Sequence, residues 1–176
     1  MKRPQLEHLI RACTQIADDD ELIVIGSQAI LGQYPDAPAL LLVSVEADVY
    51  PKNHPERADL IDGSIGEGSP FHDTFGYYAQ GVGETTATLP SGWKERLVAV
   101  RNDNTRGATG WCLEPHDLVL SKLVAGREKD ILFAEEAVRH RLVVVETLAE
   151  RLRATPLSGE LRTLVEQRVQ RLAALR

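Results

Sequence analysis

ELIVIGSQAIL (residues 21–31) and SVEADVYP (residues 44–51) are the two stretches that decide the fold. The first is an apolar run that stops at Gly26-Ser27, which predicts a short buried strand followed by a short helix. The second closes a longer apolar run and predicts another strand over residues 39–51. Each apolar pattern is interrupted by residues that could bind a ligand, so we expect the two stretches to form the halves of one site.

Glu46 and Asp48 are two residues apart in the second predicted strand, so their side chains project to the same side. Two carboxylates on one face repel each other and lose solvation unless a cation or a basic partner lies between them. Such oxygen ligands suit Mg²⁺, which commonly takes one or two protein carboxylates with phosphate oxygens and water. The alternative is an exposed face, with Val43 and Val45 on the inward side. The pair alone leaves both interpretations open.

Gly26-Ser27, directly after a buried strand, has two interpretations as well. Glycine has no Cβ and lets phosphates approach the backbone, and the serine hydroxyl and nearby amides at a helix start can receive an anion. A Gly-Ser pair at a strand end is more often plain helix capping by the serine. Taken by itself, the pair favours capping.

Hydrophobic periodicity predicts helices at both ends of the chain. Pro115 and Gly126 are typical of the first turn and the end of one of them. The predicted helices are residues 4–17, 115–125, 128–140, 145–152 and 159–175, and further strands are predicted within residues 70–82, 86–89 and 93–102. This order predicts an α+β fold, a mixed β-sheet flanked by helices with a C-terminal helical layer. The expected boundary separates residues 1–112 from residues 113–176, although one continuous domain is also possible.

Composition limits the class of protein. The chain has 176 residues, of which 43% are hydrophobic and 26% charged, as in ordinary globular proteins. No apolar run is long enough to span a bilayer, and the N-terminus has no signal-peptide pattern, so we expect a cytoplasmic protein without membrane association. Residues 18–73 hold twelve carboxylates against two basic residues, which excludes a nucleic-acid binder that is basic over its whole surface.

The pattern of Gly-Ser after one strand, a short helix and then Ser-x-Glu-x-Asp resembles the DNA polymerase β-like nucleotidyltransferase superfamily. Within it the chain is similar to small bacterial proteins related to toxin–antitoxin and abortive-infection nucleotidyltransferases. The residues that carry this resemblance are VIGSQAIL, SVEADVYP, SPFHDTFGYYAQGV, LPSGWKERL and EPHDLVLSKLVAGREKD, spread over roughly residues 20–133.

The resemblance implies a role for each of these residues. Gly26 and Ser27 would cradle the phosphates of a nucleoside triphosphate, and Glu46 and Asp48 would bind Mg²⁺ or Mn²⁺. The implied reaction is transfer of a nucleotidyl group to an RNA or protein acceptor, in a toxin-like protein with a possible antitoxin partner. Such transfer needs in-line positioning and neutralisation of charge on the reacting oxygens, which divalent metals supply.

Two departures from the family pattern leave catalysis open. Active members usually carry a third carboxylate on a later strand, and Glu84 is the best candidate here, with Glu95 a weaker one. The first acid is Glu46 where aspartate is more usual. The alternative function is a catalytically impaired nucleotidyltransferase fold that serves as a binding or regulatory module, such as an antitoxin-like partner. A third possibility is an interaction protein that dimerises through the C-terminal face bearing Leu161, Leu164 and Leu172.

The segment KLVAGREKD (residues 122–130) gathers basic residues at a helix end. The resemblance places Lys122, Arg127, Lys129 and Asp130 near the nucleotide, where arginine gives bidentate and lysine point-charge contact with phosphate. The alternative is a lysine near a helix dipole and a surface pair of Arg127 with Asp130. Other sites find no support in the sequence: no Gly-Lys-Ser/Thr phosphate loop, no zinc-ligand spacing and no Gly-x-Ser-x-Gly motif is present.

Overall fold

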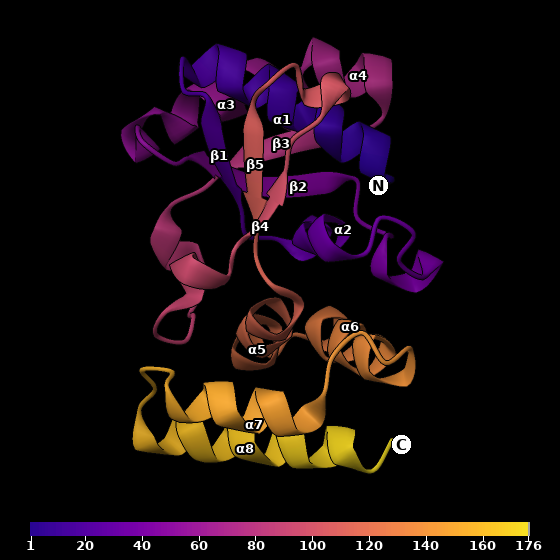
Figure 1. The fold of residues 1–176 in the computed structure, drawn as a ribbon, viewed down its shortest axis with the longest axis vertical. Helices are drawn as coiled ribbons and strands as arrows, with labels where there is room; N and C mark the ends of the chain where they lie inside the picture. The colour runs from indigo at the N-terminus through magenta and orange to yellow at the C-terminus, as the bar shows by residue number, and fades with distance from the viewer. Residues whose placement is uncertain (176) are drawn as a thin grey trace. The chain divides into compact units, whose positions relative to one another are not determined.

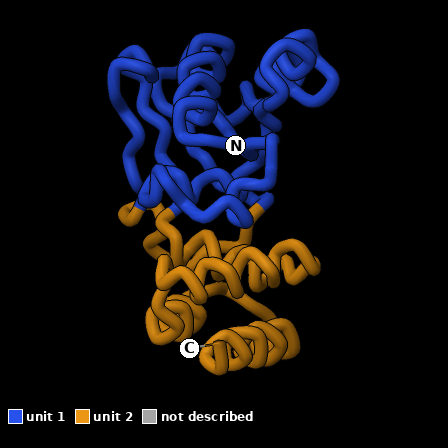
Figure 2. Tube along the Cα trace, turned by 90° about the vertical axis from the view of Figure 1, so that its right-hand side faces the viewer, with its two compact units in different colours: residues 1–86, 97–113 blue, residues 87–96, 114–176 orange. Residues whose placement is uncertain are grey.

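The computed structural model describes residues 1–175, which divide into two compact units. Unit 1 comprises Met1–Thr86 and Leu97–Leu113, and unit 2 comprises Ala87–Arg96 and Glu114–Arg176 (blue and orange in Figure 2). The chain enters unit 2 twice, because the segment before the fourth strand belongs to the helical unit.

Unit 1 is built on a five-stranded mixed sheet with the order β3-β2-β1-β5-β4 (Figure 1). The strands are β1 (Glu21–Val24), β2 (Glu46–Pro51), β3 (Tyr78–Gly81), β4 (Val98–Val100) and β5 (Thr109–Cys112). The pairs β1–β2 and β4–β5 are antiparallel, whereas β1–β5 and β2–β3 are parallel. Together with its helices, this mixed sheet confirms the predicted α+β class.

Helices cover one face of this sheet. The helices of unit 1 are α1 (Arg3–Ala17), α2 (Ile30–Gln33), α3 (Ala58–Ile65) and α4 (Pro70–Phe75). A Cβ added to Gly110 would lie 2.3 Å from Cδ1 of Ile10, and one added to Gly81 would lie 2.0 Å from the carbonyl oxygen of Ala58. Glycine at both positions therefore lets α1 and α3 approach the backbone of the sheet.

Gly110 and Gly81 lie on the face of Ala47 and Val49, so Glu46 and Asp48 project from the opposite face.

The predicted strand over residues 39–51 is wrong in its first half. Residues Ala39–Leu41 form a 3₁₀ turn after Pro38, and pairing begins only at Glu46. Leu40 is 66% and Val43 73% exposed. Their apolar side chains suggested a strand, but within residues 1–175 no neighbouring strand pairs with this segment.

Two other predicted strand segments are also wrong. Residues 70–75 form α4, because Ser69 caps the helix by accepting a hydrogen bond from the N–H of His72 and Pro70 takes the first helical position. Gly76 then ends α4 at a φ of 72°. Residues 86–89 form no strand, whereas the strand predicted at the end of residues 93–102 is present as β4.

Unit 2 consists of four helices and the segment before β4. The helices are α5 (Pro115–Ala125), α6 (Glu128–Arg139), α7 (Val145–Arg153) and α8 (Gly159–Ala173), as the periodicity predicts. Gly126 ends α5 in the left-handed region with a φ of 68°. On α8, Leu172 is buried but Leu164 remains 41% exposed. Within residues 1–175, no helix is both long and apolar enough to cross a membrane.

Candidate functional site

Gly26, two residues after the end of β1, is in contact with the carboxylate of Asp48, which lies within β2. A Cβ built on Gly26 would lie 2.0 Å from Oδ2 of Asp48, a separation that no side chain could adopt. The N–H of Ile25 donates a 3.0 Å hydrogen bond to the carbonyl of Asp48, which ties the end of β1 to this point of β2. Glycine is required at position 26 because the Asp48 carboxylate fills the space that a Cβ would take.

Glu46 is held by Tyr78 on the neighbouring strand. The two residues are register partners of β2 and β3, and the Tyr78 hydroxyl donates a 3.2 Å hydrogen bond to Oε2 of Glu46. Burial raises the pKa of Tyr78 to about 12, and the negative charges of Glu46, Glu67 and Asp48 act in the same direction. Glu46 and Asp48 are both half-buried, so this face is neither fully solvated nor part of the apolar core.

Tyr50 lies on the same face of β2 as Glu46 and Asp48, and the charge of Glu84 acts on it. Tyr50 is only 3% exposed, and its hydroxyl has no hydrogen-bond partner among the described residues. Burial raises the pKa of Tyr50, and the negative charge of Glu84 raises it further. Glu84 itself is exposed in the 3₁₀ turn Glu84–Thr86, beyond the end of β3. Its charge reaches this face of β2 from a loop rather than from a strand.

The donors on this face fit a hard divalent cation. Over residues 1–175, the Asp48 carboxylate receives no hydrogen bond and forms no ion pair with another protein group. In the same residues, no three His, Cys, Asp or Glu side chains gather closely enough to hold one metal ion. A cation here would take the carboxylates of Glu46 and Asp48 and complete its coordination with phosphate oxygens or water, as Mg²⁺ commonly does.

The turn after β1 differs from plain helix capping. Gly26 is the N-cap of the 3₁₀ turn Ser27–Ala29, no side chain caps it, and half-buried Ser27 is the first residue of the turn. The capping interpretation of Ser27 is therefore wrong. The next residue, Gln28, is fully buried, and both polar atoms of its amide lack a hydrogen-bond partner in residues 1–175. Nothing in the sequence separates Gln28 from an ordinary surface glutamine.

Three of the four residues predicted in the basic segment meet in unit 2. Asp130 is buried, and its carboxylate accepts 2.6 Å and 3.3 Å hydrogen bonds from Nε and Nη2 of Arg127 and pairs with Nζ of Lys122 at 3.2 Å. Burial alone would raise the pKa of Asp130, but the contacts with Arg127 and Lys122 outweigh it and the pKa is lowered. Lys129 is exposed. The surface-pair alternative is wrong about Asp130, which lies in the interior of unit 2.

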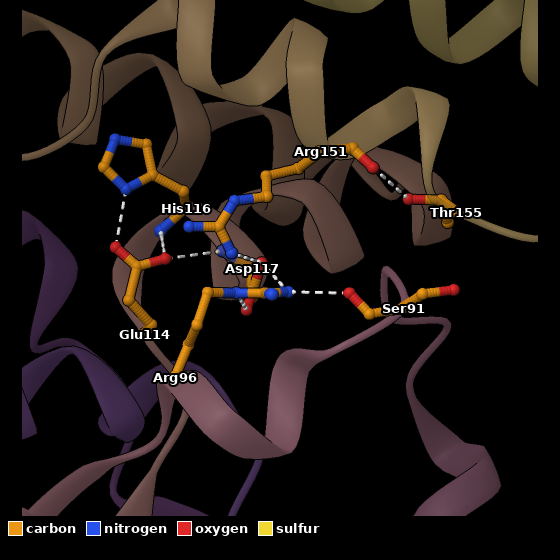
Figure 3. A network of polar contacts seen from close by, with 7 residues as sticks. All are labelled: Ser91, Arg96, Glu114, His116, Asp117, Arg151 and Thr155. Atoms are coloured by element: carbon orange, nitrogen blue, oxygen red, sulfur yellow. Dashed lines mark hydrogen bonds and ion pairs between the residues drawn. The ribbon is translucent and has the colours of Figure 1, made fainter.

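A second buried acid of unit 2, Asp117, was not singled out from the sequence (Figure 3). Arg96 contacts it at 2.8 Å through Nε, and Arg151 contacts it at 3.0 Å through Nη1. Burial raises the pKa of Asp117 to about 6, although Arg96 opposes the shift, and the nearby charge of Glu114 adds to it. Glu114 caps α5 by accepting a 3.1 Å hydrogen bond from the N–H of His116. The sequence EPHD indicates only the start of a helix, because the partners of Asp117 lie 21 and 34 residues away.

Comparison with known protein families gives a match over most of the chain. A family model described as "Nucleotidyltransferase of unknown function (DUF6036)" matches residues 4–170, nearly the whole chain. No curated protein and no solved structure matches the chain.

Proposed function

This chain belongs to the DUF6036 family of nucleotidyltransferases of unknown function, and we propose that it transfers a nucleoside monophosphate from a nucleoside triphosphate to an acceptor hydroxyl with Mg²⁺ or Mn²⁺. In this reaction the acceptor oxygen bonds to the α-phosphorus, the bond to the β-phosphate oxygen breaks, and pyrophosphate leaves with the displaced charge. The resemblance to toxin-related nucleotidyltransferases makes RNA or a protein side chain the proposed acceptor, and an antitoxin the proposed partner.

The observation that carries this proposal is the contact between Gly26 and Asp48. This contact places the turn that would receive phosphates directly beside the carboxylate that would bind the cation. Phosphate binding and cation binding would therefore occur at the same place on the sheet. Glu46, oriented by Tyr78, supplies the second carboxylate on the same face. The bound cation would neutralise charge on the phosphate oxygens during transfer.

The chain's own residues have distinct roles in the proposal. Gly26 lets the turn approach the Asp48 carboxylate, and the Ser27 hydroxyl and nearby amides receive phosphate oxygens. Glu84 is proposed to accept the proton of the acceptor hydroxyl, as its charge already acts on the face of Tyr50. Phosphate contact by Lys122, Arg127 and Lys129, with Asp130 orienting the first two, remains a proposal that rests on the resemblance.

The test is a transfer assay with α-labelled ATP, GTP, CTP and UTP, each supplied with Mg²⁺ or Mn²⁺ and with total RNA or lysate protein. We expect label to enter one acceptor class. Asp48→Asn should reduce incorporation by about 100-fold, because the lost carboxylate no longer holds the cation that positions the phosphates, and misplaced reacting groups cost on that order. The control is Asp59→Asn, which removes one negative charge from an exposed position on α3. Equal labelling by wild type and Asp48→Asn would refute the assignment of the site.

A second candidate function is nucleotide binding without transfer. It is favoured by the absence, within residues 1–175, of a three-carboxylate cluster, since Glu84, the best candidate for the third acid, lies in an exposed turn. Calorimetry with each triphosphate and Mg²⁺ separates the two functions. Binding that depends on Asp48, with no labelled product for any acceptor, would support the binding module over the enzyme.

A further inference from the structure

The strand beside the two acids offers neutral side chains at the positions that face them. In the parallel pair β2–β3, Glu46 is the register partner of Tyr78, and Asp48 is the register partner of Gln80. Register partners on neighbouring strands project from the same face, and the strands are about 4.8 Å apart. Gln80 therefore lies next to Asp48 on the side of the sheet that α1 and α3 do not cover.

Gln80 is available to a ligand. It is exposed, and within residues 1–175 its carboxamide makes no hydrogen bond to another protein group. Tyr78, by contrast, is buried and already donates to Glu46. Of the two β3 residues that face the acids, Gln80 is therefore the one whose side chain makes no hydrogen bond within residues 1–175.

We propose that Gln80 is the third protein oxygen ligand of the cation site, through its carboxamide oxygen, and that its neutrality makes cation binding depend on the nucleotide. The proposal rests on the proposed function. Two carboxylates and an amide balance the charge of one divalent cation, which leaves room for the negative charge of a triphosphate. A third carboxylate would hold the cation tightly without nucleotide and would repel the triphosphate.

The test is Mn²⁺ binding to the nucleotide-free protein, followed by electron paramagnetic resonance and calorimetry. We expect weak binding by the wild type, about tenfold tighter binding by Gln80→Glu, and about threefold weaker binding by Gln80→Ala. A unit negative charge about 5 Å from a divalent cation accounts for a tenfold effect even at the dielectric constant of water. The control is Gln33→Glu, which adds the same charge at an exposed position on α2. We expect it to bind Mn²⁺ as the wild type does.

The outcomes separate this inference from the function on which it rests. If Gln80→Glu and Gln33→Glu bind Mn²⁺ equally while Asp48→Asn abolishes wild-type binding, the role of Gln80 is refuted and the cation site stands. If the tighter binding of Gln80→Glu survives addition of Asp48→Asn, the added charge acts elsewhere and the inference fails. If Mn²⁺ binds to neither the wild type nor Gln80→Glu, both the inference and the proposed cation site are overturned.

Discussion

Asp48 of unit 1 differs from two acids of unit 2, Asp117 and Asp130, in whether protein groups hold its carboxylate. In unit 2, Asp117 and Asp130 are buried, and each is held by two basic side chains of the same unit. In unit 1, the half-buried carboxylate of Asp48 forms no ion pair or hydrogen bond with any described residue. For these two buried acids the chain supplies the counter-charge, because an unpaired buried charge is costly. This difference supports the proposal that a ligand supplies the counter-charge of Asp48.

The two structural acids also differ from each other. Asp117 and Asp130 occupy the same place, three residues after the N-cap of α5 and of α6, and each has two cationic partners. The pKa of Asp117 is raised to about 6, whereas that of Asp130 is lowered. For Asp117, burial dominates and the neighbouring charge of Glu114 adds to it. For Asp130, Arg127 and Lys122 outweigh burial. Two cationic contacts therefore do not fix the direction of a shift, and the depth of burial and the nearest like charge decide it.

The largest expected effect is the loss of Asp117. Asp117→Ala leaves Arg96 and Arg151 without their shared carboxylate, and we expect the free energy of unfolding to fall by about 3 kcal/mol, since breaking a buried ion pair costs about that much. Asp117→Asn keeps the shape and one acceptor oxygen for the arginines, so it should cost clearly less. Urea denaturation at pH 7 measures both. Equal losses for the two variants would mean that hydrogen-bond geometry at Asp117 contributes nothing.

The next effect concerns unit 1, where the prediction is a loss of function rather than of stability. Gly26→Ala places a Cβ 2.0 Å from Oδ2 of Asp48, so the carboxylate must move away from the turn. We expect nucleotidyl transfer to fall by about 100-fold, because misplacement by about 1 Å costs on that order.

The matched control for Gly26→Ala is Gly63→Ala in α3, where an added Cβ meets nothing within 4 Å. It should stabilise the helix by about 0.5–1 kcal/mol and leave transfer unchanged. Circular dichroism and the transfer assay are measured on both variants. Full activity in folded Gly26→Ala would refute the importance of the Gly26–Asp48 contact.

Much of this arrangement follows from local sequence patterns. Alternation places Glu46 and Asp48 on one face, and Pro115 and Gly126 bound a helix, because these rules involve only neighbouring residues. The resemblance of the combined Gly-Ser and Glu-x-Asp pattern to nucleotidyltransferases connects the acids with the turn in one predicted site. The strand boundary at Glu46 could not be predicted, since exposed Val43 and buried Val49 are the same residue type and differ only in whether a partner strand lies alongside.

The contacts that the sequence did not predict depend on long-range packing. Arg96 and Arg151 reach Asp117 from distant segments, and neither arginine has a spacing that singles it out. Gln80 faces Asp48 only because β3 pairs with β2 in one register, which a shift of one residue would destroy. Contacts of this kind depend on how elements pair and pack, which no local pattern specifies.

A smaller effect follows from the raised pKa of Asp117. Between about pH 4 and pH 6 the folded protein keeps a proton on Asp117 that the unfolded chain has lost, so the free energy of unfolding falls as the pH rises through this window. The slope is at most about 1.4 kcal/mol per pH unit. Urea denaturation from pH 4 to pH 7 on wild type and Asp117→Asn isolates this contribution, because the variant lacks the titrating group. If the free energy of unfolding of the wild type rose relative to that of Asp117→Asn as the pH increased, the raised pKa of Asp117 would be contradicted.

The smallest effect is expected at Arg127, whose side chain is 61% exposed although it contacts buried Asp130. Because solvent screens an exposed cation and Lys122 remains in place, Arg127→Ala should lower the free energy of unfolding by only about 1 kcal/mol at pH 7. The lowered pKa of Asp130 sets the sign of the pH dependence: its stabilisation is present above about pH 4 and is lost as the pH falls through the folded pKa. The difference in free energy of unfolding between Arg127→Ala and wild type should therefore be smaller at pH 3 than at pH 7. Lys129→Ala, an exposed neighbour in the same turn of α6, is the control and should change stability at neither pH. If Arg127→Ala lowered the free energy of unfolding as much as Asp117→Ala, solvent exposure of Arg127 would not weaken its ion pair with Asp130.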